Sequence, residues 1–191
     1  TLTEGHPVVT DIVLTGAISE TDLLQIAASL EQGSDHPLAK AILNQATTRH
    51  IDCLPITDFT SHTGQGVTAT YNGIKHLLGS PGFLESNGAD INQTRLSALQ
   101  AQGKSIVAIA AYSKSTPLVI GYLGIADPLR STSAKAIKRL QSMNIEVIML
   151  TGDNEATAAA IAAQVGIQNF RAEVLPQDKA ATVESIKSDG H

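Results

Sequence analysis

The sequence predicts an α/β protein in two parts, an antiparallel sheet covered by helices and a shorter parallel sheet whose strands alternate with helices. For the first part, Asn72-Gly73 stands between two strand-like runs, which is a strong signal for a two-residue hairpin. Strands followed by helices and hairpins in this order indicate a helix-covered antiparallel sheet. For the second part, strands and helices alternate on a short period after Gly124, as in parallel sheets with right-handed crossovers.

The first elements carry clear start and stop signals. Residues 8–14 are rich in Val and Ile and predict a strand. Ser19 is the predicted N-cap of a helix, because acidic residues occupy the turn that follows, and Gly33 ends that helix. Pro37 suits the first turn of a second helix, and this places His36 at the mouth of that helix.

The remaining elements are predicted from hydrophobic periodicity and from the glycines and prolines that interrupt it, with a domain boundary near residue 124. They are strands at 56–61, 68–71 and 74–78, helices at 81–86 and 92–102, strands at 105–112 and 118–123, a strand ending at 127, a helix at 133–143, a strand ending at 150, a helix ending at 166, a strand at 170–174 and a helix from 177 onward.

Composition narrows the classes of function. The 191 residues are 42% hydrophobic and 16% charged, and the net charge of −5 without a basic block argues against nucleic acid as the main partner. No apolar run approaches the length of a bilayer span. The single cysteine, Cys53, excludes an internal disulfide. Cys53, His50, His62 and His76 stand in dissimilar settings, so we expect no zinc or copper cluster from them.

A short apolar run at 148–150 breaks into Thr151-Gly152-Asp153, and a helical pattern follows at once. The carboxyl end of a buried strand, at a helix start, is where open α/β sheets place ligand chemistry, and its amides suit a phosphate oxyanion. Thr151 can donate its hydroxyl, and Gly152 lets its amide approach closely. Asp153 is either an organiser of the turn or merely a helix cap. The alternative for the whole stretch is a plain strand-to-helix turn with a Thr or Asp cap.

Three charged residues complete the candidates. Lys179 can act as a point charge on the same phosphate oxygens, or it is a solvated lysine at a helix start. Asp127 ends a strand, and the simplest interpretation is a capping Asp paired with Arg130.

Six stretches of the chain have the form of short motifs, in this order: Thr1-Leu2-Thr3-Glu4-Gly5, Ser34-Asp35-His36-Pro37-Leu38-Ala39, Gly64-Gln65-Gly66-Val67, Asp127-Pro128-Leu129-Arg130, Met149-Leu150-Thr151-Gly152-Asp153-Asn154 and Pro176-Gln177-Asp178-Lys179. They resemble motifs of the P-type cation ATPases, specifically the heavy-metal subgroup typified by copper exporters. Each is weak alone, but six in this order are very specific, and they cover essentially the whole chain. One departure is Asp35, where the family more commonly has Glu.

The resemblance implies an α+β nucleotide-binding domain at 8–123 and a haloacid-dehalogenase-like phosphorylation domain at 1–7 and 124–191, which is truncated. It also implies ATP and Mg²⁺ as cofactors. The implied roles are adenine contacts from Glu31 and His36, backbone packing against the nucleotide at Gly64 and Gly66, closure of the pocket at Gly79, a hinge contact at Asp127 and Arg130, and a phosphoryl site at Thr151, Gly152, Asp153 and Lys179.

The implied function is the coupling of ATP hydrolysis, through an aspartyl phosphate, to the translocation of a heavy-metal cation. Copper is the favoured cargo over zinc, cadmium or lead, and it would bind elsewhere in the transporter. The implied partners are the actuator and transmembrane domains of the same protein, and the location is the cytoplasmic side of an integral protein of a bacterial inner or plasma membrane.

We expect the chain to be a piece of such a transporter, because it lacks an initiator Met and the phosphate-accepting Asp would precede Thr1. Such a piece would bind nucleotide without forming the aspartyl phosphate. Two alternatives stay open. One is a free-standing phosphatase of the haloacid dehalogenase type, although Asp127-Pro128-Leu129 lacks the second Asp of the expected Asp-x-Asp. The other is a nucleotide-sensing module without chemistry.

Overall fold

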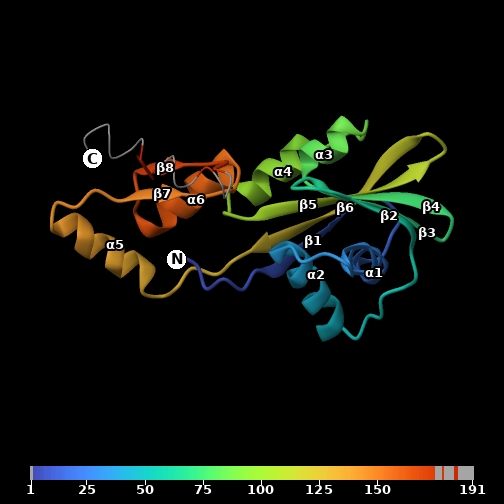
Figure 1. Ribbon diagram of the computed structural model, residues 1–191, viewed down its shortest axis with the longest axis horizontal. Helices are drawn as coiled ribbons and strands as arrows, with labels where there is room; N and C mark the ends of the chain where they lie inside the picture. Colours follow the sequence, from blue (N-terminus) through green and yellow to red (C-terminus); the bar gives the residue numbers. More distant parts are fainter. Residues whose placement is uncertain (1, 175–177, 179–182, 185–191) are drawn as a thin grey trace. The chain divides into compact units, whose positions relative to one another are not determined.

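The computed structural model describes residues 2–174, 178 and 183–184, which form two compact units (Figure 1). The larger unit takes in residues 4–96 and 106–128, and the smaller unit takes in residues 2–3, 97–105 and the described residues from 129 onward. The chain therefore passes between the units four times. The assignment of nucleotide binding and phosphorylation to separate domains stays a prediction.

A six-stranded sheet forms the centre of the larger unit. The elements from the N-terminus to the end of this sheet are β1 (Val8–Leu14), α1 (Glu20–Glu31), α2 (Pro37–Thr48), β2 (Thr57–His62), β3 (Gly66–Tyr71), β4 (Ile74–Gly79), α3 (Pro81–Ser86), α4 (Gln93–Gln100), β5 (Ser105–Ser113) and β6 (Thr116–Ala126). The strand order is β1-β6-β5-β4-β3-β2, and β1 pairs antiparallel with β6 as β2, β3, β4 and β5 do with one another. The predicted antiparallel sheet is confirmed.

The predicted hairpin between β3 and β4 is also confirmed. Asn72 and Gly73 have positive φ angles of 49° and 73°, as a two-residue turn that follows the strand twist requires. The strands on either side pair in register from Tyr71 opposite Ile74.

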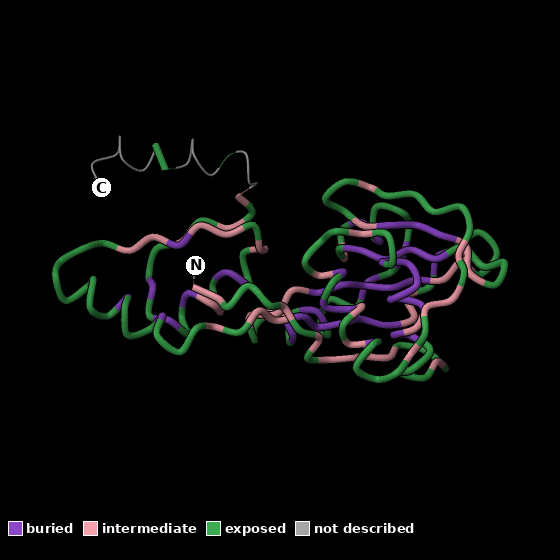
Figure 2. Tube along the Cα trace, turned by 60° about the horizontal axis from the view of Figure 1, so that its bottom comes forward, coloured by how far each residue is buried: buried purple, intermediate pink, exposed green. Residues whose placement is uncertain are grey.

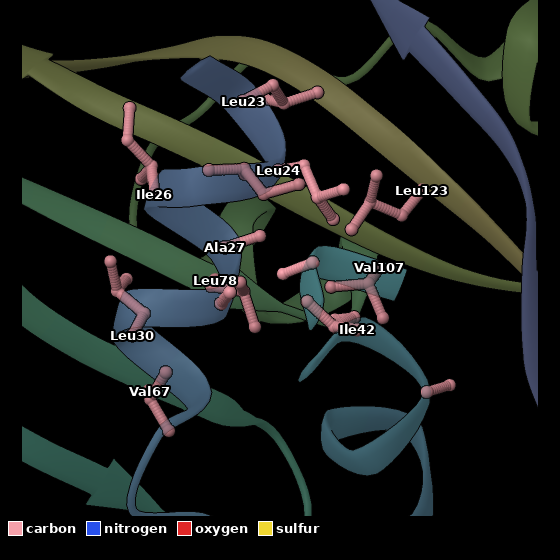
Figure 3. Packing of buried hydrophobic residues seen from close by; sticks show 14 of the residues in the cluster. Leu23, Leu24, Ile26, Ala27, Leu30, Ile42, Val67, Leu78, Val107 and Leu123 are labelled. Atoms are coloured by element: carbon pink, nitrogen blue, oxygen red, sulfur yellow. The ribbon is translucent and has the colours of Figure 1, made fainter. Parts of the chain in front are cut away.

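The core of the larger unit lies between the sheet and the pair α1 and α2. Leu23, Leu24 and Leu30 of α1 are fully buried. They belong to one cluster with Leu78 of β4 and Leu123 of β6 (Figure 3). Truncation of one such leucine to alanine costs about 2–5 kcal/mol, so this layer contributes much of the unit's stability. Helix α3 and the start of α4 lie on the other face of the sheet (Figure 1).

Two glycines let β3 and β4 approach closely at one point. A Cβ built on Gly66 would lie 2.3 Å from the Leu78 carbonyl oxygen, and one built on Gly79 would lie 2.3 Å from the Gln65 carbonyl oxygen. The Phe83 ring packs over the same place, 2.8 Å and 3.0 Å from the two built atoms. Only glycine fits at either position.

The smaller unit contains α5 (Ser133–Ser142), β7 (Ile148–Leu150), α6 (Glu155–Val165) and β8 (Asn169–Arg171). Strands β7 and β8 pair in parallel, which confirms the predicted parallel arrangement. Its core cluster consists of Ile137, Met149, Ala158, Ala162, Val165 and Ile167. Most of α5 is exposed (Figure 2). The helix expected from residue 177 onward falls largely outside the described residues, among which no helix is long and apolar enough to cross a bilayer.

The predicted strand break near Gly124 is wrong. Strand β6 continues through Gly124, and Ile125 and Ala126 pair with Val9 and Val8 of β1. Gly124 provides clearance instead of ending the strand, because a Cβ there would lie 3.0 Å from the Asp11 carboxylate. The last residues of β6 therefore belong to the antiparallel sheet.

We predict that Gly66→Ala or Gly79→Ala destabilises the chain by about 1–3 kcal/mol, the usual cost of overpacking. The reason is the collision of the new Cβ with a backbone carbonyl of the neighbouring strand. Thermal unfolding followed by circular dichroism measures the effect. Gly82→Ala is the matched control, because Gly82 lies in α3 with nothing within 4 Å of a built Cβ. Equal melting temperatures for all three variants would contradict the close approach.

Candidate functional site

The Thr151-Gly152-Asp153 turn directly follows β7 and is tied to the segment after β8. The Thr151 amide donates to the Arg171 carbonyl at 3.0 Å, and the Val174 amide donates back to the Thr151 carbonyl at 2.9 Å. The Glu173 amide donates to the Asp153 carbonyl at 2.9 Å. Both ends of the turn are thereby held by backbone hydrogen bonds, which gives it a defined geometry.

The side chains of the turn form a closed network. The Thr151 hydroxyl donates to Asp153 Oδ2 at 2.7 Å, and the Asp153 amide donates to the same hydroxyl oxygen at 3.1 Å. The Ser105 hydroxyl donates to Asp153 Oδ1 at 3.2 Å. Asn154, whose Oδ1 accepts from the Thr157 amide at 3.0 Å, is the N-cap of α6. The alternative that Asp153 is merely the helix cap is wrong, and its role as organiser stays a prediction.

Gly152 lies at the centre of this turn and has room around it. A Cβ there would meet only the Val174 carbonyl oxygen, at an ordinary contact distance of 3.6 Å. Within the described part of the chain, the Thr151 and Asp153 amides have acceptors and the Gly152 amide has none. Packing therefore does not demand glycine here, and one amide is available to an anion. Lys179, the fourth predicted member, lies outside the described residues.

Ser34 lies between Glu31 and His36 in the chain and forms hydrogen bonds with the backbone of both residues. Glu31 is the last residue of α1; burial raises the pKa of its carboxylate, and the Ser34 side chain lowers it in part. The Ser34 hydroxyl oxygen accepts from the His36 amide at 3.4 Å, while the Ser34 amide donates to the Glu31 carbonyl at 2.9 Å. Ser34 thus links the end of α1 to the start of α2.

Glu31 carries an unsatisfied acceptor. The residue is 7% exposed, and its Oε2 atom is buried without a hydrogen-bond partner. Burial raises the pKa of Glu31, and the Ser34 side chain opposes this only in part. A buried, unpaired carboxylate oxygen is costly, and among the described residues Oε2 lacks the hydrogen-bond partner that buried oxygens normally have.

His36 is the N-cap of α2, as predicted from Pro37. Its Nδ1 accepts from the Leu38 amide at 3.2 Å. An accepting Nδ1 carries no proton, so this geometry assigns the proton of the neutral ring to Nε2. The residue is exposed, and its Nε2–H can donate to a ligand.

The predicted glycines are held in place for two different structural reasons. Gly64 lies in the turn between β2 and β3 with a φ of +71°, a conformation that favours glycine. Gly66 and Gly79 face each other at the close approach of β3 and β4. Their role towards a nucleotide stays a prediction.

Asp127 and Arg130 bind the N-terminal segment instead of forming a simple cap. Asp127 Oδ1 accepts from the amides of Gly5 and His6 at 3.0 Å and 3.1 Å. In the smaller unit, Arg130 Nε donates to the Thr3 carbonyl at 2.8 Å. Each side chain therefore joins the N-terminal segment to the segment around residues 127–130 within its own unit. A hinge role for the two residues stays a prediction.

The described residues contain no group of three or more His, Cys, Asp and Glu side chains that could hold a metal ion. The described residues therefore assemble no ligand set for a resident Mg²⁺ ion, which is bound through oxygen atoms.

Two residues of these networks were not predicted to have a role. Ser34 belongs to the Ser34-Asp35-His36-Pro37 stretch, so the motif contained a signal for it. Ser105 lies 48 residues before Asp153, and no local pattern indicates their contact.

Comparison with known proteins places these features in a family. The family model described as haloacid dehalogenase-like hydrolase matches residues 1–191. The copper-exporting P-type ATPase of Staphylococcus saprophyticus is 40% identical over 190 residues, covering 98% of this chain and 23% of that protein. A probable cadmium-transporting ATPase of Listeria monocytogenes is 42% identical over 197 residues, covering 98% of this chain and 27% of that protein.

A solved structure has the same fold. The crystal structure of a zinc-transporting PIB-type ATPase in its E2.Pi state matches with a TM-score of 0.69 and 33% identity, over 99% of this chain and 30% of that chain. The chain thus spans about a quarter of the length of the curated relatives, at 23% and 27% of the two named above. Because the family model matches its whole length, the chain belongs to the haloacid dehalogenase-like hydrolase family, and its relatives there are heavy-metal P-type ATPases.

Proposed function

We propose that this chain is the ATP-binding and phosphorylation region of a P-type ATPase that transports a heavy-metal cation across a membrane. Its relatives include proteins named for copper, cadmium and zinc. Copper is the favoured cargo, on overall likeness to the copper exporters. The cation would bind in the transmembrane part of the longer protein, next to an actuator domain, with this region on the cytoplasmic side.

The observation that carries the proposal is the buried Oε2 of Glu31, which has no hydrogen-bond partner among the described residues; the exposed His36 follows five residues later. An adenine ring presents an amino group that donates and ring nitrogens that accept. The pair therefore supplies one acceptor and one donor to a base, without the stacked aromatic pair that many nucleotide sites use. The backbone around Gly64, Gly66 and Gly79 would complete this site.

The phosphoryl half of the proposal rests on the turn after β7. The Gly152 amide is available, and the Thr151 hydroxyl can join it after leaving Asp153 Oδ2. Such positioned donors are what phosphoryl transfer chiefly requires. The magnesium ion that ATP chemistry uses would have to enter with the nucleotide. The proposed phosphoryl acceptor is an aspartate that precedes the Thr1-to-Gly5 stretch in the family motif.

The alternative of a free-standing phosphatase has less support. Its nucleophile would be Asp127, the best strand-end candidate within the chain, yet Asp127 Oδ1 accepts two backbone amides. Turnover of a generic phosphomonoester that is lost in Asp127→Asn would revive this alternative. Sequencing the surrounding gene separates the transporter from a nucleotide-sensing module, because membrane spans with a Cys-Pro-Cys upstream support transport.

We predict that His36→Asn lowers the affinity for ATP severalfold while leaving the melting temperature near that of the wild type. Asn is a good N-cap, so the variant keeps the start of α2 and loses only the imidazole. Glu31→Ala should weaken ATP binding to a similar extent. Isothermal titration calorimetry with MgATP measures both. His6→Ala is the control, because His6 is exposed and its only role described above is the backbone amide bond to Asp127. Unchanged affinity in both site variants would reject the adenine site.

We predict that Glu31→Gln stabilises the unliganded chain at pH 7 by about 1 kcal/mol, because it removes a buried charge and keeps nearly the same side-chain size. The pKa of Glu31 is raised in the folded state, so the protonated side chain favours folding. This contribution to the free energy of unfolding is fully present below about pH 4.3, where an exposed Glu titrates, and is lost as the pH rises through the raised pKa. The gain should therefore shrink towards pH 4. Chemical denaturation at pH 4 and pH 7 tests this, and a gain independent of pH would be inconsistent with a buried charge.

We predict that Gly152→Ala lowers the affinity for inorganic phosphate about tenfold, the loss of one hydrogen bond to a charged group. The added methyl group would shield the one available amide of the turn, whereas its single ordinary contact should leave stability nearly unchanged. The shift of the residue 152 amide in an NMR titration with phosphate gives the affinity. An alanine variant that binds phosphate as well as the wild type would exclude this amide from the site.

A further inference from the structure

The loop at 101–104, between α4 and β5, packs against α6 in the smaller unit. The Lys104 carbonyl accepts from the Thr157 hydroxyl at 3.0 Å, and Thr157 is 1% exposed. Gly103 has a φ of +75°, and a Cβ there would lie 3.2 Å from Ile161 Cγ1. Thr157 and Ile161 lie on successive turns of α6, so the loop packs along this helix. Helix α6 follows the Thr151-Gly152-Asp153 turn, which we call the phosphoryl turn.

The packing of this loop on α6 brings the Ser105 hydroxyl within hydrogen-bond distance of the Asp153 carboxylate. Ser105 Oγ donates to Oδ1 at 3.2 Å, and Thr151 Oγ1 donates to Oδ2 at 2.7 Å. A carboxylate held through one oxygen can still turn about its terminal torsion, which has a broad minimum. A second hydrogen bond on the other oxygen fixes its plane, and bonds to an ionised acceptor are strong.

We propose that Ser105 is a positioning residue of the phosphoryl turn, acting through Asp153 on the hydroxyl of Thr151. This inference rests on the proposed function, in which the turn binds phosphate. The Thr151 hydroxyl has one proton, and in the unliganded chain it donates that proton in a hydrogen bond to Asp153 Oδ2. To donate to a phosphate oxygen, the hydroxyl must rotate and leave Oδ2.

When the Thr151 hydroxyl has left Oδ2, the hydrogen bond from Ser105 still holds the Asp153 carboxylate. With Oδ1 retained by Ser105, Asp153 stays in place and does not follow the hydroxyl towards the incoming anion. Without Ser105, the carboxylate can swing towards the phosphate, and two like charges then repel each other. Loss of the Ser105 hydroxyl should therefore weaken phosphate binding without any contact between Ser105 and phosphate.

The test uses the 191-residue chain labelled with ¹⁵N and titrated with inorganic phosphate, with the Gly152 amide shift as the readout. We expect Ser105→Ala to raise the Kd for phosphate about three- to tenfold, and Ser105→Thr, which keeps the hydroxyl, to stay within about twofold of the wild type. Ser142→Ala is the matched control, because it removes a serine hydroxyl bond, 2.7 Å to the Arg139 carbonyl, in the same unit.

Two results would overturn the inference alone. One is saturable phosphate binding by the wild type with an unchanged Kd in Ser105→Ala, even if that variant melts at a lower temperature. The other is an equal loss in Ser105→Ala and Ser105→Thr, which would show that the hydroxyl is not the cause. Absence of saturable binding in the wild type would instead overturn the phosphoryl half of the proposed function, and this inference with it. The adenine half is judged separately by ATP binding in His36→Asn.

Discussion

The packing of α1 and α2 on the six-stranded sheet is the constraint on which the proposed nucleotide site depends. Leu30 is fully buried in this layer, and Glu31 follows it as the last residue of α1. Glu31 is itself only 7% exposed, and Ala27 and Ala28, one turn earlier on the same side of α1, are fully buried. The hydrophobic layer therefore supplies the free energy that keeps a carboxylate in a place where its charge is disfavoured.

The two proposed sites differ in the kind of polar group that lacks a partner. In the larger unit an acceptor, Glu31 Oε2, is buried and has no partner among the described residues. In the smaller unit both oxygens of Asp153 accept hydrogen bonds, and the donor without an acceptor among the described residues is the Gly152 amide. An unpaired acceptor matches the donors on the edge of a base, and an unpaired donor matches the oxygens of a phosphate. Each unit thus leaves open the group that complements one part of a nucleotide.

Local chemistry explains which features could be predicted from the sequence. The hairpin at Asn72-Gly73 and the cap at His36 follow from backbone preferences of a few neighbouring residues, and the structure has both. Gly124 misled the prediction because glycine usually interrupts a strand, whereas here its missing side chain accommodates Asp11 across the pair with β1. The contact of Ser105 with Asp153 could not be predicted, since it arises only when a distant loop packs on α6. Lys179 lies outside the described residues, so its place in the turn's chemistry stays a prediction.

The four passages of the chain between the units have a consequence for biosynthesis. The larger unit is complete once Pro128 has been made, whereas the smaller unit is assembled from three separate stretches, the last of which starts at Leu129. On a ribosome the sheet and its two covering helices can therefore acquire their native packing first. The Thr151-Gly152-Asp153 turn forms only afterwards. Residues 97–105 are synthesised earlier, and they can pack only after α6 has been made.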